Sequence, residues 1–165
     1  MRRISRRLSL ALLLAALLPA FASSANAAEI VLDKVTGAVK SSCIREDKNG
    51  NLICLVVYTK PPYLGFQFGS QEDPDSVAVT AGARRATNSK LEIKVGRYAS
   101  HAVFGEGFVG KEAEAIRDEI ESGTKASISF ESQDTKIATQ GEIDLKDFKA
   151  ALREVEALRD MQGGK

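Results

Sequence analysis

The feature that most constrains the fold of this sequence is a single pair of cysteines, Cys43 and Cys54, separated by ten residues. This spacing differs from the C-x-x-C of redox enzymes and zinc sites. Asn49-Gly50 lies near the middle of the intervening segment, and this dipeptide is a strong β-hairpin signal. A four-residue loop over 47–50 places the two cysteines directly opposite each other, whereas a two-residue loop would offset them by two positions. The cysteines therefore favour a hairpin with the longer loop.

The first 27 residues have the pattern of a secretory signal peptide. Four arginines and no acidic residue precede an apolar stretch from Leu8 to Phe21, and Ala25-Asn26-Ala27 matches the A-x-A cleavage pattern. A membrane anchor is the alternative, but fourteen residues are too few to cross a bilayer as a helix. We therefore expect an exported mature chain over 28–165 that is not transmembrane. In an oxidising compartment its cysteines form a structural disulfide, with a redox-active thiol pair as the alternative.

Removal of the signal peptide changes the charge of the chain. The full sequence has 23 basic and 22 acidic residues, so loss of the four arginines leaves 19 against 22, a net charge of −3. This balance argues against a nucleic-acid partner, which normally requires a basic domain. The remaining 138 residues are long enough for one domain with its own hydrophobic core.

Short apolar and β-branched runs separated by turn residues recur along the mature chain, which is typical of an antiparallel all-β domain. The run over 52–59 is apolar at nearly every position, so we expect that strand to be buried on both faces. The predicted strands cover residues 30–32, 43–45, 52–59, 63–68, 77–80, 91–95, 98–104, 125–131 and 135–143.

Two helices interrupt the strands. The first covers 111–122 and ends at Gly123. The second covers 144–161 with Asp144 as its N-cap, and its apolar residues form one stripe. Such a stripe most often packs on the protein's own sheet, with a partner or a membrane surface as the alternative. The apolar positions are Leu145, Phe148, Leu152, Val155 and Leu158. The predicted fold is a mostly β antiparallel sandwich with one short helix and a C-terminal amphipathic helix, the helices covering an edge or an end.

One segment matches the dinucleotide-binding pattern G-x-G-x-x-G through Gly105, Gly107 and Gly110. It follows a predicted strand and precedes a predicted helix, and Glu131 lies where the ribose-binding acid would be expected. However, the preceding strand is half polar, whereas the first strand of a parallel sheet is nearly all apolar. Only 34 residues follow Glu131, too few to complete a doubly wound sheet. We expect no cofactor and interpret the glycines as a connection, with nucleotide binding as the alternative.

No other residues form a convincing catalytic or metal site. His101 is the only histidine and has no cysteine near it, so we expect a structural role and no metal. Five basic residues and one acid lie between 84 and 97, which together with an acidic first helix would suit a charged partner surface. Solvated loop and strand residues explain this segment equally well. We interpret the acids of the first helix as a solvated face. They are Glu112, Glu114, Asp118, Glu119 and Glu121.

Taken in order, these features resemble the invasion-associated locus B family of exported alphaproteobacterial proteins. The segment 122–130 is similar to the family's glycine-then-strand segment, and 141–152 resembles its closing strand and L-x-x-F-x-x-A-L helix. The chain departs from the family in having no tryptophan and no second cysteine pair. The resemblance implies a β-sandwich of the periplasm or envelope without enzymatic activity, in a family linked to host-cell invasion. We therefore expect a binding or interaction protein with a protein or envelope partner, or alternatively a purely structural envelope protein.

Overall fold

The structure is a computed structural model, and it describes residues 28–46, 50–69, 77–82, 86, 89–132 and 138–163. The predicted signal peptide lies outside the described residues. Within the described part, no helix is long and apolar enough to cross a membrane.

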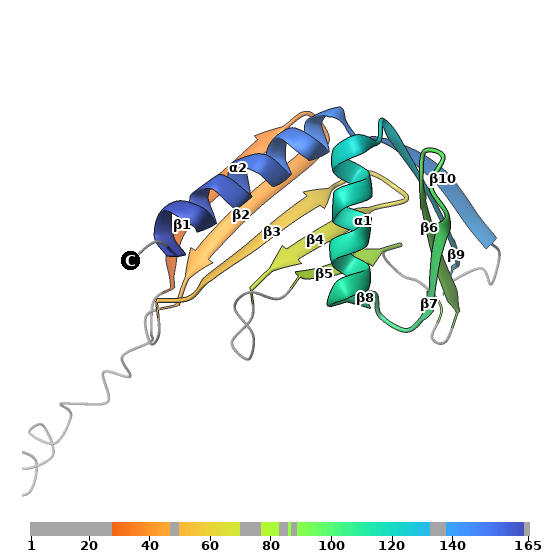
Figure 1. The fold of residues 1–165 in the computed structure, drawn as a ribbon, viewed down its shortest axis with the longest axis horizontal. Coiled ribbons are helices and arrows are strands. Elements are labelled where there is room, and N and C mark those ends of the chain that lie inside the picture. The colour runs from red at the N-terminus through yellow and green to blue at the C-terminus, as the bar shows by residue number, and fades with distance from the viewer. Residues whose placement is uncertain are drawn as a thin grey trace, which may run out of the picture.

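The described strands form two antiparallel sheets (Figure 1). The larger sheet has the strand order β1-β2-β3-β4-β5-β8, with β1 at Glu29–Thr36, β2 at Val39–Arg45, β3 at Leu52–Tyr58, β4 at Leu64–Phe68, β5 at Val77–Ala81 and β8 at Phe108–Val109. The smaller sheet has the order β10-β9-β6-β7, with β10 at Ala138–Asp144, β9 at Lys125–Glu131, β6 at Lys90–Val95 and β7 at Ser100–Phe104. With α1 at Lys111–Ser122 and α2 at Lys146–Gly163, the predicted fold class is confirmed.

Three parts of the larger sheet differ from the sequence prediction. β1 runs to Thr36 instead of ending at residue 32, and β2 begins at Val39 instead of residue 43. The two strands pair up to a tight turn at Gly37, where φ is +59°, with one register shift between Ile30 and Leu32. The polar pair Asp33-Lys34 hides this extension from an analysis based on apolar runs. The short strand β8 was not predicted, since it lies inside the glycine-rich segment.

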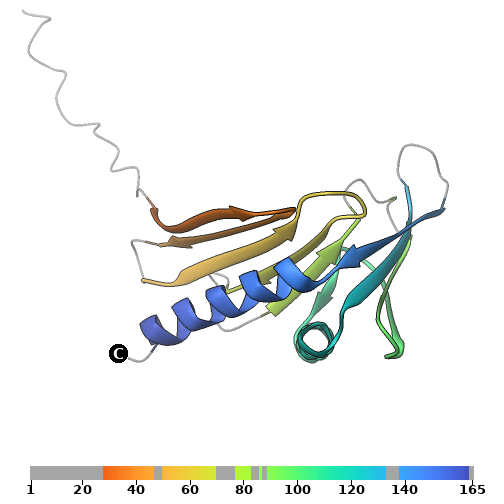
Figure 2. The ribbon, with the colours of Figure 1, turned by 90° about the horizontal axis from the view of Figure 1, so that it is seen from above.

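α2 lies across the face of the larger sheet and not at an edge or an end as predicted, whereas α1 lies over its β5–β8 edge (Figures 1 and 2). α2 lies against β2 and β3, and α1 lies against β5 and β8. The predicted apolar stripe of α2 is confirmed, because Leu145, Phe148, Leu152 and Val155 are all fully buried. The carboxylate of Asp144 accepts a 2.8 Å hydrogen bond from the Lys146 backbone N–H at the start of this helix.

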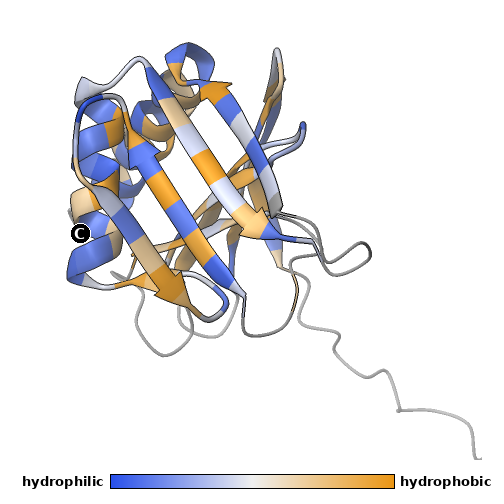
Figure 3. Cartoon of the chain, turned by 90° about the vertical axis from the view of Figure 1, so that its right-hand side faces the viewer, coloured by the Kyte–Doolittle hydropathy of each residue, from blue (hydrophilic) through white to orange (hydrophobic). Residues whose placement is uncertain are grey.

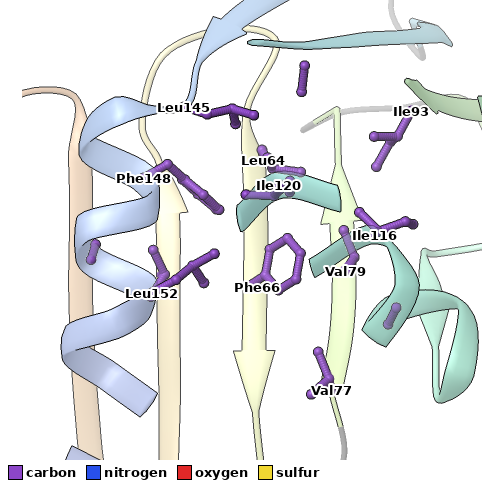
Figure 4. Packing of buried hydrophobic residues seen from close by; sticks show 14 of the residues in the cluster. Leu64, Phe66, Val77, Val79, Ile93, Ile116, Ile120, Leu145, Phe148 and Leu152 are labelled. Carbon is purple, nitrogen blue, oxygen red and sulfur yellow. The ribbon is translucent and has the colours of Figure 1, made fainter. Parts of the chain in front are cut away.

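A single hydrophobic core joins the helices to the sheets. The ring of Phe148 on α2 meets that of Phe66 on β4 edge-on, with ring centroids 5.8 Å apart. Ile116 and Ile120 of α1 lie above the neighbouring strands (Figure 4). The inner faces of β3, β4 and β5 therefore require both helices to be shielded from water.

The cysteine pair and its register are confirmed. Cys43 on β2 lies directly opposite Cys54 on β3, and their sulfur atoms are bonded at 2.04 Å. The backbone N–H of Glu46 donates to the Asn51 carbonyl at 3.0 Å, which continues the same register toward the turn. The structure therefore has the hairpin register that the longer loop predicts.

The expectation that β3 is buried on both faces was wrong. Cys54 and Val56 point inward and are fully buried, but Leu55 points outward and is 40% exposed. Ile44 on the adjacent strand is exposed on the same outer face. Residues along a strand alternate between faces, as the hydrophilic and hydrophobic colours along the strands show (Figure 3). The apolar outward residues of β3 concealed this alternation.

Two leucine-to-alanine substitutions test this division between inner and outer faces. Leu152→Ala should lower the free energy of unfolding by about 2–5 kcal/mol, because it opens a cavity under α2. Leu55→Ala should cost less than about 1 kcal/mol, because that side chain is partly in water. Urea denaturation of the mature chain measures both values. If both substitutions lowered the free energy of unfolding equally, the outer face of the sheet would also be covered.

Candidate functional site: a groove between the two helices

The glycine-rich segment joins the two sheets. It follows β7 in the smaller sheet and contains β8, which pairs antiparallel with β5 in the larger sheet before α1 begins. A dinucleotide-binding site instead requires a strand, turn and helix within a parallel sheet. Glu131 ends β9 in the smaller sheet, and its backbone carbonyl accepts a 2.8 Å hydrogen bond from Ala86. The described pairs therefore lack the parallel sheet that the motif would need.

The local backbone geometry explains why two positions of this segment are glycine. A Cβ added at Gly107 would lie 2.2 Å from the backbone carbonyl oxygen of Val79, so only glycine allows the chain to approach β5 this closely. Gly110 has φ +59° immediately before α1, a backbone conformation that glycine adopts most readily. Gly105 meets nothing closer than 3.9 Å. The motif is thus explained by chain packing at two of its three glycines.

His101 links β7 to α1. Its side chain is 16% exposed and lies between two glutamates, with Nδ1 3.6 Å from Glu112 and Nε2 3.2 Å from Glu119. The imidazole also packs edge-on against Phe108. Glu119 is mostly buried, so the acids of α1 are not simply the solvated face that the sequence predicts. Among the described residues, no group of three or more potential ligands is arranged to hold a metal ion.

A groove of about 830 Å³ lies between α1 and α2. Its walls come from the polar edges of both helices, and its floor comes from the adjacent ends of β3 and β4. This size lies within the range of small-molecule sites. The lining residues are Arg117, Asp118 and Glu121 of α1, Glu156, Arg159, Asp160 and Gln162 of α2, and Gly50, Asn51, Leu52 and Phe68 below them.

Ion pairs connect the two walls. Arg117 on α1 lies 3.1 Å from Asp118 on the same helix and 3.7 Å from Glu156 on α2. Arg153 on α2 reaches back to Glu121 at 2.7 Å. Each of these pairs is partly exposed and contributes little to stability.

An aromatic ring forms part of the floor. Phe68 is fully buried by its neighbours, and the guanidinium group of Arg159 lies 5.2 Å from the centre of its ring. This is the geometry of a cation–π interaction. Arg159 therefore covers this ring, and the groove presents the guanidinium group at this point of its floor.

The position of Glu156 in the groove changes the pKa of its carboxyl group. Burial raises its pKa above the ordinary value of 4.5, and Arg117 opposes this effect. The negative charges of Glu121, Asp160 and Asp118 raise the same pKa further. The net upward direction shows that the positive charge of Arg117 does not offset burial together with the neighbouring carboxylates.

This groove was not predicted from the sequence. Phe68, Arg117 and Glu156 are far apart in the chain, and only the packing of both helices on one sheet face brings them together. Positions 156, 159 and 160 share one side of α2, which in sequence resembles an ordinary solvated face. Among the described lining residues there is no serine, threonine, cysteine or histidine. The described lining thus offers charged contacts but no hydroxyl or thiol nucleophile and no imidazole.

Comparison of the chain with models of protein families, with curated proteins and with solved structures found no match.

Two glycine substitutions test whether the glycine-rich segment needs glycine for close packing against β5. Gly107→Ala should lower the free energy of unfolding by about 1–3 kcal/mol, because the new methyl group would collide with β5. Gly105→Ala should change it by less than about 0.5 kcal/mol, because that site is open. Thermal and urea unfolding measure both. If Gly107→Ala were as stable as Gly105→Ala, the packing explanation would be wrong.

Glu156→Gln tests the electrostatics of the groove. Because the folded-state pKa is raised, ionised Glu156 lowers stability once the pH rises above the ordinary carboxyl pKa of 4.5. The neutral variant should therefore be more stable than the parent protein at neutral pH, and this gain should vanish below pH 4.5. Unfolding measured across the pH range gives the difference. Glu114→Gln, at an exposed position of α1, is the control and should show no such gain.

Proposed function

We propose that this chain is an exported, non-enzymatic binding or interaction protein of the bacterial periplasm or envelope, and that the groove between α1 and α2 is its binding surface. The observation that carries this proposal is the groove itself, an open hollow whose walls carry arginines and carboxylates. Arginine is enriched at recognition surfaces.

The lining favours binding over catalysis. Nucleophilic catalysis by a side chain commonly uses a serine, cysteine or threonine activated by a neighbouring base, and the described lining offers none of the three. Its arginines and carboxylates are instead placed on two helices that are fixed by the core. A rigid pair of walls loses little entropy when a ligand binds, which favours recognition.

The features of the chain that resemble the invasion-associated locus B family support the same assignment. The hairpin joined by Cys43–Cys54, the β-rich middle and the closing strand followed by a helix occur in the order that the resemblance implies. The signal-peptide pattern over 1–27 supports export, and a disulfide is typical of an oxidising compartment. The partner is a component of the envelope or of a host cell.

NMR mapping on the mature chain, residues 28–165, tests the proposal. Isotope-labelled protein would be titrated with envelope extract separated into a lipid fraction, a peptidoglycan digest and a periplasmic peptide fraction. At least one fraction should shift the amide signals of Gly50, Asn51 and Gln162 at the groove. The double variant Arg117→Ala/Arg159→Ala should lose the response, whereas Glu114→Gln should keep it.

Two results would overturn the proposal. One is the absence of any groove response to all three fractions. The other is turnover of chromogenic ester, phosphate or glycoside substrates by the purified protein, reduced by the same double variant.

A further inference from the structure

The outer face of the larger sheet, on the side away from α1 and α2, is rich in apolar side chains. Ile30, Ile44 and Ile53 lie opposite one another on β1, β2 and β3 and form one row across the sheet. Ile30 is 70% exposed, and Val35 further along β1 is 68% exposed. We call this surface the outer apolar face. Its apolar residues on the first three strands are Ile30, Val35, Ile44, Ile53, Leu55 and Val57.

The smaller sheet shows what a water-facing surface looks like in the same protein. The outward positions of its strands β6 and β9 carry only charged or hydroxyl side chains. Lys125 pairs with Glu142 on that surface at 3.1 Å, and Lys90 pairs with Glu92 at 3.1 Å. Among the described outward positions of β3, β4 and β5 in the larger sheet, by contrast, none is charged. An exposed apolar patch of this kind marks a surface for association.

The outer apolar face is large enough for a weak dimer. Its five strands β1 to β5 are spaced by about 4.8 Å, and its outward residues span about 20 Å along the strands, which gives about 500 Å² on each copy. Two copies packed face to face therefore bury about 1,000 Å², the lower limit for a specific interface. We propose that the outer apolar face is a dimerisation surface on which a second copy of this chain packs. This inference goes beyond the proposed function and does not depend on it.

The charges on the face favour a second copy over a charged partner. Asp33 and Lys40 are the charged residues at the described outward positions of β1 to β5, and they pair with each other at 3.0 Å. An acidic or basic partner would therefore meet no complementary charge, whereas two identical neutral faces meet without net repulsion. A twisted sheet also packs well on another sheet, as in β-sandwiches, and a twofold axis gives both copies the same contacts.

A lipid surface fits this face less well. Proteins that lie on a bilayer combine apolar side chains with lysine or arginine, which contact anionic headgroups, and with aromatic residues at the interface. The described outward positions of β1 to β5 include one lysine, Lys40, which is already paired with Asp33. None of these described positions is aromatic.

The dimer leaves the groove of each copy open. Both helices lie on the opposite side of the larger sheet from the outer apolar face (Figure 2). When two copies pack through that face, the two pairs of helices therefore lie on the outside of the dimer. A dimer of this kind presents two grooves that face away from each other, so it can hold two partners or two sites of one partner.

Analytical ultracentrifugation of the mature chain, residues 28–165, tests the proposal. Between about 1 μM and about 500 μM the mean mass should rise from that of a monomer toward that of a dimer, because an interface of this size supports weak association. Added NaCl should not weaken the dimer, because apolar contacts hold it together. The methyl NMR signals of Ile44 and Leu55 should shift over the same concentration range, whereas those of the buried Ile116 should not.

Two lysine substitutions locate the interface. Leu55→Lys places a charge in the outer apolar face and should weaken the dimer at least about tenfold. Leu55 lies on β3, two strands in from the edge strand β1, so edge-to-edge strand pairing would not be affected. Met161→Lys is the matched control, because Met161 is an apolar residue on α2 that is 71% exposed and lies outside the face. It should leave the dimer affinity unchanged. Thermal unfolding of both variants at low concentration checks that the monomer is folded.

A monomer at every concentration would overturn the proposal, and so would a dimer whose affinity is the same in Leu55→Lys. If Leu55→Lys does not fold, the methyl shifts of the unsubstituted protein still decide whether Ile44 and Leu55 lie in the interface. Binding of a monomeric chain to phosphatidylglycerol vesicles, lost in Leu55→Lys, would assign the face to a lipid surface and overturn the dimer. These measurements do not involve the groove, so their failure leaves the proposed function standing.

Discussion

The burial of the inner face of the larger sheet under α2 is the interaction on which the rest of this structure depends. An antiparallel sheet with one apolar face must cover that face, and here the cover comes from the last helix of the chain. Phe148 packs edge-on against Phe66, and Leu145, Leu152 and Val155 continue the contact along the helix. Full burial of each such side chain contributes about 1.5–3 kcal/mol, so this stripe is a large share of the stability of a small domain.

The groove is a consequence of that packing. Because the apolar stripe of α2 faces the sheet, the adjacent residues Glu156, Arg159 and Asp160 project toward α1 and form one wall. The opposite wall is fixed by Ile116 and Ile120, which bury α1 against the same core. The walls are therefore positioned by hydrophobic contacts. The partly exposed ion pairs between them contribute mainly to the electrostatic field in the groove.

Local patterns in the sequence predicted the elements better than their arrangement. The helical stripe of α2 reflects one buried face, so it was predicted with its burial, and the cysteines predicted one hairpin register. The division of strands between two sheets depends on pairings such as β6 with β9, which leave no local signal. The groove could not be predicted from the sequence either, because its residues are also brought together by long-range packing. Gly123 ends α1 as predicted, but with φ −82° and not in the left-handed conformation. Glycine is favoured there for a different reason, because a Cβ would lie 2.5 Å from the Val95 side chain.

The glycine-rich segment shows how a motif can match in sequence and serve a different physical need. A dinucleotide fingerprint uses glycine for backbone approach to a pyrophosphate. Here Gly107 allows approach to the backbone of β5, and Gly110 turns the chain directly into α1. The crossing from one sheet to the other therefore determines where α1 begins and how it lies on β5 and β8. Because α1 supplies one wall of the groove, these glycines shape the candidate binding site through the backbone without belonging to its lining.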